Sequence, residues 1–228
     1  IVDELIAFLA PKSRRGQQVL VTAGPTHEAI DPVRGITNLS SGKMGFAIAR
    51  AAREAGADVT LVAGPVHLPT PRGVRRIDVQ SAQNMLKAVT HQAQEAHIFI
   101  ATAAVADWRP ATAATEKIKK DGSGQTPALG FVENPDILAT VARSPRAQAG
   151  DLYCVGFAAE SHDLLAHATA KRVRKGVPLL VGNIGPATFG QDDNALLLVD
   201  DQGYRELPRA SKRVLAQQLI ADIAARLR

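Results

Sequence analysis

The sequence predicts an α/β fold, a Rossmann-like parallel sheet with helices on both faces, followed by a C-terminal β-hairpin and helix. Short runs rich in apolar and β-branched residues alternate along the chain with segments of helical periodicity. Two of the helical segments also end at a glycine, Gly56 and Gly176, which is a common helix stop. This alternation is typical of parallel strands joined by crossover helices.

The elements follow from this alternation in chain order. We expect strands at 18–24, 58–64, 74–79, 97–104, 151–157 and 178–183. We expect helices between them at Gly42–Ala55, Ala82–Ala96, Pro135–Ala142 and Asp163–Lys175. In an open sheet, ligands bind at the carboxyl ends of strands where the strand order reverses. By position alone, this rule selects Gly24, Gly64, Ala104 to Asp107, Phe157 to Glu160 and Asn183.

The pattern changes in the last part of the chain. Asn194–Asp200 and Tyr204–Leu207 flank a turn-forming segment and predict a β-hairpin, and Ser211 is expected to cap a final helix through Arg228. The polar segment Ala111–Pro127 has no apolar periodicity and predicts a mobile loop that could serve as a lid. We expect residues 1–16 to be an interdomain linker with a helix at 1–10, and residues 17–228 to form one domain.

Composition limits the classes of function. Aromatic residues make up only 4% of the chain, so stacking platforms for single-stranded nucleic acid are scarce. The formal net charge of +5 is spread over several segments, and a phosphorylated small molecule accounts for it as well as a polyanion does. Cys154 is the only cysteine and lies in an apolar run, which indicates a buried thiol in a reducing cytoplasm. No run of about 18 apolar residues predicts a membrane span.

A candidate phosphate site follows the first predicted strand. Residues Ser40 to Gly45 read SSGKMG and open the expected helix, so two hydroxyls, small glycines and unpaired N–H groups would surround an anion. The segment does not match the common phosphate-binding motifs, the P-loop and GxGxxG. Lys43 is followed by Met44 rather than by Ser or Thr, and the turn is longer than GxGxxG requires. The segment therefore predicts a less common phosphate-binding design.

Other segments allow both a functional and a purely structural interpretation. The segment Asp31 to Asn38 is crowded with hydrogen-bonding side chains, which could bind a ligand. In the structural interpretation it is an ordinary loop whose side chains bond its own backbone. Lys117 to Lys120 is a candidate anion-binding run or a solvated charge run. Asp107 follows a buried strand, where a carboxylate can hold Mg²⁺ or a ribose hydroxyl. Lys171 and Lys175 share one helix face and could act together on a ligand. In the structural interpretation they only place positive charge at a helix C-terminus.

Seven segments together resemble one family, the phosphopantothenate-cysteine ligases (phosphopantothenoylcysteine synthetases), found in bacteria as the C-terminal domain of a bifunctional coenzyme A biosynthesis protein. The resemblance covers Gln17 to Leu227. It rests on AGPT at 23–26, DPVR-x-I-x-N-x-SSGKMG at 31–45, AAVADWRP at 103–110, EKIKK at 116–120, NPDI at 134–137, VGFAAE at 155–160 and KRVRKG at 171–176.

The resemblance implies a reaction, its substrates and an assembly. The family joins 4'-phosphopantothenate to L-cysteine, and the bacterial members use CTP with Mg²⁺ or Mn²⁺ through an acyl-cytidylate, releasing pyrophosphate and CMP. It also implies a cytoplasmic homodimer in which the lid or the hairpin closes a neighbouring subunit's site. Because the chain opens at Ile1, we expect it to be the ligase part of a protein fused to a flavin-dependent phosphopantothenoylcysteine decarboxylase. FMN is therefore not expected to bind here, and neither nucleic acid nor a membrane is an expected partner.

The resemblance also implies roles for particular residues. Asn38 matches a functional asparagine expected to bind the substrate carboxylate or acyl-cytidylate, and Lys117 matches the lysine of the lid. Arg34 is a candidate ligand of the substrate's phosphate or carboxylate, and Asp107 is the candidate metal ligand, with ribose binding as the alternative. The remaining residues expected at the nucleotide are Ser40, Ser41, Gly42, Lys43, Met44, Gly45, Ala104, Asn134, Pro135, Asp136, Ile137, Phe157, Lys171 and Lys175.

Two other functions fit the fold less well. A nicotinamide-dependent reductase needs a glycine-rich turn joined directly to its helix and a proton donor such as Tyr-x-x-x-Lys, and neither Tyr153 nor Tyr204 has a lysine four residues on. A nucleic-acid-binding module would need recognition motifs and aromatic stackers that the sequence lacks.

Overall fold

The computed structural model describes residues 2–10, 12–120, 122, 126–160, 162–184 and 190–227. Its centre is an eight-stranded sheet with the order β12-β11-β10-β9-β6-β1-β4-β5. Six of these strands are parallel: β1 (Gln18–Ala23), β4 (Asp58–Ala63), β5 (Arg75–Asp78), β6 (Ile98–Ala101), β9 (Tyr153–Glu160) and β10 (Leu179–Ile184).

The order of the parallel strands is that of a Rossmann fold. From β1 the chain adds β4 and β5 on one side, and it then returns to add β6, β9 and β10 on the other. The strand order therefore reverses between β1 and β6, which is where ligands bind in such sheets. This confirms the predicted fold class.

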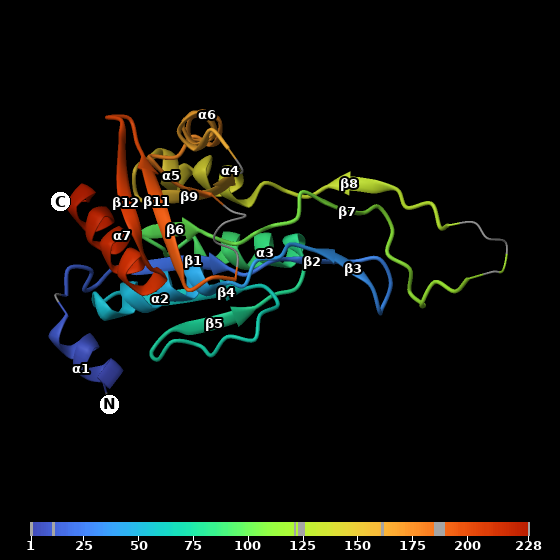
Figure 1. Cartoon of the computed structure of the whole chain (residues 1–228), viewed down its shortest axis with the longest axis horizontal. Coiled ribbons are helices and arrows are strands. Elements are labelled where there is room, and N and C mark those ends of the chain that lie inside the picture. Colours follow the sequence, from blue (N-terminus) through green and yellow to red (C-terminus); the bar gives the residue numbers. More distant parts are fainter. Residues whose placement is uncertain are drawn as a thin grey trace.

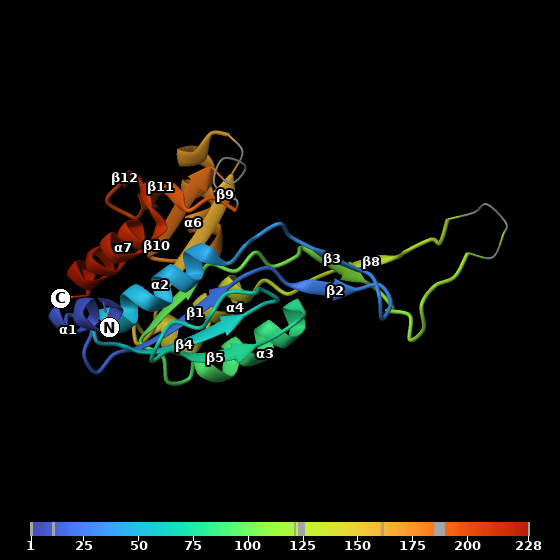
Figure 2. The same ribbon diagram turned by 60° about the horizontal axis from the view of Figure 1, so that its bottom comes forward.

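Helices cover both faces of the sheet, as Figures 1 and 2 show. On one face, α2 (Lys43–Glu54) packs against β1, β4 and α7 (Lys212–Arg226). On the other face lie α3 (Ala82–Gln92), α4 (Ile137–Ala142), α5 (Pro145–Gln148) and α6 (Leu164–Lys175). Strand β1 shows why two cores form: Val19 and Val21 belong to the cluster on the α2 side, and Leu20 belongs to the opposite cluster with Phe99. Alternate residues of a strand point to opposite faces.

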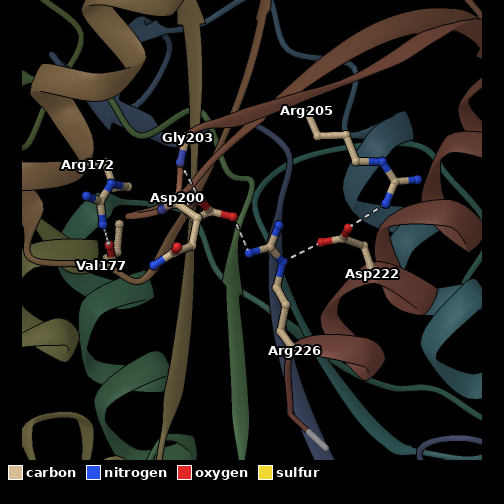
Figure 3. Close-up of polar contacts among 8 residues, drawn as sticks. Arg172, Val177, Asp200, Gly203, Arg205, Asp222 and Arg226 are labelled. Carbon is tan, nitrogen blue, oxygen red and sulfur yellow. Dashed lines mark hydrogen bonds and ion pairs between the residues drawn. The ribbon is translucent and has the colours of Figure 1, made fainter.

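The predicted hairpin is present and extends the chain's own sheet. Strand β11 (Asp193–Val199) pairs antiparallel with β10, and β12 (Tyr204–Ser211) pairs with β11 at the outer edge. The predicted cap of the last helix is confirmed, because Ser211 Oγ accepts a hydrogen bond of 3.3 Å from Val214 N. At the far end of α7, Arg226 pairs with Asp200 of the hairpin turn and, over 2.5 Å, with Asp222 (Figure 3). These contacts tie both ends of α7 to the hairpin.

Two short strand pairs form an arm that projects from the carboxyl ends of the sheet (Figures 1 and 2). Strand β2 (His27–Ala29) pairs with β3 (Gly35–Thr37), and β7 (Trp108–Pro110) pairs with β8 (Phe131–Glu133). The sequence predicted no strands here. Each strand has only three residues, which is too short for an alternating pattern to stand out.

Element boundaries differ from the predictions by a few residues. The helix expected to reach Ala96 ends at Gln92, because Gln94 and Glu95 make the shorter bonds of a tightening last turn. The helix expected from Pro135 begins at Ile137, because Asp136 caps it. Strand β9 continues to Glu160 rather than ending at residue 157.

The N-terminal helix is present as α1 (Val2–Leu9). Within the described residues, every helix is too short or too polar to span a bilayer.

Candidate functional site

A cavity of about 160 Å³ lies at the point where the strand order reverses. The turn before α2 forms one wall. The segment after β6, the last residues of β9 and β10, and the first residues of β11 and α7 form the others. Its lining residues are Ser40, Ser41, Gly42, Lys43, Met44, Gly45, Thr102, Ala103, Ala104, Phe157, Ala159, Asn183, Asn194 and Lys212. The structure thus brings the predicted phosphate-binding turn, Ala104 and Phe157 to the wall of one cavity.

Threonine hydroxyls hold the ends of β1 and β6 together beside this cavity. Thr102 Oγ1 donates to the carbonyl oxygen of Thr22, and Thr22 Oγ1 accepts from Ala103 N over 3.2 Å. Beyond the ends of these two strands, Thr26 Oγ1 accepts a hydrogen bond from Ala106 N over 3.0 Å. Hydroxyls can both donate and accept, so they satisfy backbone groups where the regular ladder ends. The floor of the cavity is therefore a fixed surface.

Two glycines allow α2 to start directly above this floor. Gly42 precedes the helix with a φ of 75°, a conformation that residues with a side chain adopt only at a cost. Gly45 sits so close to the strands that a Cβ atom there would lie 2.5 Å from both Ala23 Cβ and Thr102 Oγ1. The first N–H groups of a helix lack intrahelical partners and carry partial positive charge. The start of α2 is therefore suited to an anion in the cavity.

The side chains that line the cavity also carry positive charge. Among the described residues that line it are two lysines and no carboxylate. Lys43 Nζ bonds the Gly190 carbonyl oxygen over 2.9 Å and Asp192 Oδ1 over 2.6 Å. Lys212 is only 8% exposed, and its ammonium group donates to the carbonyl oxygen of Gln191. Burial and the nearby Lys43 lower the pKa of Lys212 from its ordinary value. An anion would relieve the mutual repulsion of these ammonium groups.

A second cavity, of about 590 Å³, lies on the arm next to the first. Asn38 and Asp107 line it together with Ile36, Ala106, Trp108, Phe131 and Glu133. Asn38 Nδ2 donates to the carbonyl oxygen of Ala104 over 2.9 Å, and Ala104 lines the first cavity. Asn38 therefore stands between a phosphate-sized cavity and a larger, partly apolar one.

The side chain of Asp31 anchors the polar segment at the tip of β2–β3. Its carboxylate accepts bonds of 2.8 Å from the N–H groups of Val33 and Arg34, as the purely structural interpretation of this loop expected. It also accepts from the Arg34 guanidinium and from Ile118 N, while Arg34 Nη2 donates to Ile118 O over 2.8 Å. The Arg34 hydrogen bond is the main reason that the pKa of Asp31 lies well below its usual range. Arg34 thus has structural partners, although 49% of its side chain stays exposed.

These contacts also fix where Lys117 lies. Lys117 directly precedes Ile118, so the expected lid segment is attached to the arm at this point. The arm extends away from the sheet in both views (Figures 1 and 2). Lys117 is exposed and does not line the cavity at Ser40–Gly45 of its own chain. The single chain therefore does not bring these two predicted features together.

A third group of predicted residues lies beside the cavities, between α4 and α6. Asn134 Nδ2 donates to Ala106 O over 2.9 Å, which ties it to the strand-end segment of Asp107. Asp136 caps α4 and forms an ion pair with Lys175. Burial raises the pKa of Asp136, but the Lys175 hydrogen bond and other contacts outweigh it, so the net direction is downward. Lys171 Nζ lies 3.3 Å from Glu160 Oε1. Pro135 and Ile137, which were also predicted to bind the nucleotide, flank Asp136 in the chain.

The residues fit only one kind of metal binding. In the part of the chain that the structure describes, no three His, Cys, Asp or Glu side chains come together as a metal cage. Mg²⁺ commonly binds through one or two carboxylates plus substrate phosphates. Asp107, which is exposed and lines the second cavity, suits that mode. Cys154 is 2% exposed, and burial raises the pKa of its thiol to about 12, which confirms its interpretation as a buried apolar residue.

Some lining residues were missed by sequence reasoning. Thr102 and Ala103 lie one and two residues before Ala104, where the range selected by the strand-end rule begins, whereas Ala159 and Asn183 were themselves selected. Asn194 and Lys212 come from the C-terminal hairpin and helix, far along the chain. The only signal for Lys212 was its place after the capping Ser211, and that signal predicts a helix start rather than a cavity wall.

A parallel sheet in Rossmann order, with a positively charged, glycine- and hydroxyl-lined cavity where the order reverses, defines an α/β protein of the nucleotide-binding fold class. The model of the DNA/pantothenate metabolism flavoprotein C-terminal domain matches residues 14–227. The chain therefore belongs to this family.

Individual relatives agree with this assignment. The chain is 51% identical over 224 residues to the coenzyme A biosynthesis bifunctional protein CoaBC of Vibrio cholerae, covering 95% of this chain and 55% of that protein. It is 46% identical over 231 residues to CoaBC of Escherichia coli K12, covering 99% and 56%. The chain thus spans about half the length of these curated relatives.

A solved structure shares the fold over nearly its whole length. The crystal structure of the C-terminal domain of CoaBC superposes with a TM-score of 0.80 at 35% identity, covering 95% of this chain and 98% of that one. The resemblance drawn from the seven sequence segments is confirmed by these similarities.

Proposed function

We propose that this chain is a phosphopantothenate-cysteine ligase that uses CTP. In the first step, a carboxylate oxygen of 4'-phosphopantothenate attacks the α-phosphorus of CTP, the bond to the β-phosphate oxygen breaks, and pyrophosphate leaves. In the second step, the amine of L-cysteine attacks the acyl carbon, the bond to the CMP oxygen breaks, and the amine loses a proton. Activation is needed because an unactivated carboxylate would have to expel oxide.

The observation that carries this proposal is the pair of adjoining cavities with Asn38 between them. The first is lined by the start of α2 and by lysines, and it suits a chain of phosphates. The second is larger, has the aromatic side chains of Trp108 and Phe131 on its wall, and suits the uncharged middle part of 4'-phosphopantothenate. A ligase that joins a nucleotide phosphate to an acyl group needs these two environments side by side. The sequence similarity to CoaBC proteins supports the same reaction.

The first half-reaction needs positive charge around the triphosphate. The N–H groups at the start of α2, the hydroxyls of Ser40 and Ser41, and Lys43 would provide it in the cavity. Lys117 would add a further charge when the lid closes. Asp107 would hold Mg²⁺ (or Mn²⁺) that accompanies the triphosphate, and the ion would neutralise part of the developing negative charge. Binding of the ribose by Asp107 is the alternative role.

The second half-reaction needs the acyl group held in place for the amine. Asn38 is suited to this task because its amide can donate to a carboxylate oxygen and accept from an amine. Its present hydrogen bond to Ala104 O fixes the side chain at the border of the two cavities. Positioning of this kind can supply a large part of a rate enhancement without a covalent enzyme intermediate.

The remaining predicted residues would surround the nucleoside. Ala104 and Phe157 lie on the cavity wall, and the ion pair of Asp136 with Lys175 joins the α4 and α6 sides of the site. Asn134, Pro135, Ile137 and Lys171 lie on the same side and complete the nucleotide-binding set. Arg34 would contact the phosphate or carboxylate of 4'-phosphopantothenate through its exposed part while it stays paired with Asp31.

We further propose a cytoplasmic homodimer in which the arm of one subunit completes the site of the other. Several large apolar side chains are exposed on the arm and beside it: Val33, Leu39, Trp108, Phe131 and Val132, with exposures from 39% to 85%. An exposed apolar surface of this kind is typical of a protein interface. Lys117 belongs to the same arm, so a partner could supply it. In the whole protein, the chain would be fused to a flavin-dependent decarboxylase, and FMN would bind there.

A pyrophosphate-release assay with each of the four nucleoside triphosphates tests this function. We expect pyrophosphate only when CTP, Mg²⁺ and 4'-phosphopantothenate are all present, and amide product only when cysteine is added as well. Equal turnover with ATP would reject the choice of nucleotide and point to the ATP-using branch of the family. Failure of all four nucleotides would reject the ligase activity of this chain.

A further inference from the structure

Glu28 is a buried carboxylate for which the roles assigned so far have no use. It lies in the middle of β2 and is 2% exposed. Its Oε1 accepts a hydrogen bond of 2.8 Å from the N–H group of Ala82, the first residue of α3. Glutamate is rarely buried to this extent unless its charge is compensated. The positive end of a helix dipole and a helical N–H group without an intrahelical partner provide such compensation.

The start of α3 thus has a cap that comes partly from the arm. Ser81 forms a capping box with the first turn of the helix, through hydrogen bonds of 3.2 and 3.3 Å. Glu28 adds an acceptor for the N–H group of Ala82 from a segment 54 residues earlier in the chain. Beside it, His27 N donates to Gln80 O over 2.8 Å. The root of the arm is therefore joined to the start of α3 through a side chain as well as through the backbone.

The two strands at the root of the arm connect this anchor to the second cavity. Glu28 pairs with Ile36 of β3, and Ile36 lines that cavity. Strand β3 ends at Thr37, whose Oγ1 donates to Thr26 O over 2.8 Å, and Asn38 follows directly. The described residues that line the first cavity include none from β2 or β3. A shift of β2 should therefore disturb the second cavity more than the phosphate-binding turn.

We propose that Glu28 is a positioning residue for the acyl half of the site. By accepting from the start of α3, it fixes the root of the arm, and the arm then holds Asn38 at the border of the two cavities. This inference rests on the proposed function and adds a residue that acts through Asn38 without touching a substrate. The helix is a suitable anchor, because α3 packs against β1, β4 and α4 in the body of the molecule.

Two measurements on the whole chain test this role. In Glu28→Ala, we expect the calorimetric Kd for CTP and for inorganic pyrophosphate to stay at the wild-type value. Amide formation is measured by quenching after cysteine is added to enzyme loaded with CTP, Mg²⁺ and 4'-phosphopantothenate. Its rate should fall by at least about tenfold, since a misplacement of about 1 Å can lower a rate about a hundredfold.

Two companion variants show whether the hydrogen bond to α3 is the cause. Glu28→Gln should retain most of the rate of amide formation, because its amide oxygen can still accept from Ala82 N. Glu95→Ala, at an exposed position just beyond α3, is the matched control and should behave like the wild type in both measurements. A loss in Glu28→Gln as large as in Glu28→Ala would contradict the anchoring role of this hydrogen bond.

The pattern of losses separates positioning from a purely structural role. If Glu28 only stabilised the fold, Glu28→Ala would lower Tm and leave both measurements unchanged, or would weaken nucleotide binding and amide formation together. Either result would overturn the proposal. Glu28→Asp keeps the charge but is one methylene shorter, and it serves if the alanine variant does not fold. It should show the same selective loss with a smaller amplitude, and wild-type amide formation in this variant would also overturn the proposal.

A double-mutant cycle tests whether Glu28 acts through Asn38. Adding Glu28→Ala to Asn38→Ala should lower the rate of amide formation little further, because the side chain that Glu28 positions is already missing. Losses that multiply would show that the two residues act independently and would reject the inference. Amide formation by the wild type is the reference: its absence would reject the proposed function itself, whereas wild-type behaviour of Glu28→Ala in an active enzyme would reject only the role of Glu28.

Discussion

Gly45→Ala is the substitution that the structure opposes most directly at the phosphate-binding turn. The new methyl carbon would lie 2.5 Å from Ala23 Cβ and Thr102 Oγ1 and 3.1 Å from Ala23 Cα. Carbon atoms pack at about 3.5–4.0 Å, so a gap of about 1 Å must open between α2 and the sheet. Overpacking of this size costs about 1–3 kcal/mol, and the better helix propensity of alanine returns about 1 kcal/mol. We therefore expect a net loss of no more than about 2 kcal/mol.

Activity should suffer more than stability. A shift of about 1 Å in a binding element can lower the rate about a hundredfold, because the N–H groups at the start of α2 would no longer meet the phosphates. We expect kcat/KM for CTP to fall by about that factor, and Tm to fall by about 4–8 °C at most for a domain of this size. The measurements are pyrophosphate-release kinetics and thermal unfolding monitored by circular dichroism.

Gly130→Ala is the matched control for this prediction. A Cβ atom at that position meets only Ala111 Cβ, at the ordinary distance of 3.8 Å, so both kcat/KM and Tm should remain at the wild-type values. Wild-type kcat/KM in Gly45→Ala would refute the reasoning, since it would mean that the close approach of α2 to the strand ends has no bearing on the nucleotide.

Three further predictions concern the lid, the acyl site and the arm. Lys117→Gln should reduce acyl-cytidylate formation, measured by single-turnover quench, by more than it weakens CTP binding measured by calorimetry; equal losses in both would make Lys117 a simple binding charge. Asn38→Asp should form some acyl-cytidylate, detected by mass spectrometry, but give little amide, because the donor is lost and a negative charge is added; wild-type rates in both halves would leave Asn38 with a structural role. The pKa of Asp31 is lowered chiefly by the Arg34 hydrogen bond, so its stabilising effect is fully present above the unfolded carboxyl pKa and is lost as the pH falls through the folded one. The stability difference between wild type and Asp31→Asn in urea should therefore shrink below about pH 4, and a difference that grows with acidity would have the wrong sign.

Local pattern and chemistry were sufficient to predict the sheet and most of its helices. The strand at residues 18–23 is a short apolar run followed by Gly24, and the helix at 43–54 has a helical apolar period and follows Gly42. Such signals depend on neighbouring residues only. The cap at Ser211 was predictable for the same reason. The position of the phosphate-binding turn followed from the rule that ligands bind at strand ends.

Features that depend on distant contacts were not predictable from such patterns. The arm forms because three-residue strands pair across gaps in the sequence, and a segment that short has no detectable period. Lys212 reaches the cavity only because β11 and β12 fold back along the sheet edge and place the start of α7 beside the turn at Lys43. The contacts of Asp31 and Arg34 with Ile118 likewise require the arm to be folded.

Transfer of an oxygen isotope tests the central claim most directly. The chain would be incubated with CTP, Mg²⁺, cysteine and 4'-phosphopantothenate carrying ¹⁸O in its carboxyl group, and the products would be analysed by mass spectrometry. Attack of the carboxylate on the α-phosphorus predicts that one ¹⁸O atom appears in CMP and none in pyrophosphate. Label in inorganic phosphate with release of CDP would show activation by phosphoryl transfer instead, and would contradict the acyl-cytidylate mechanism.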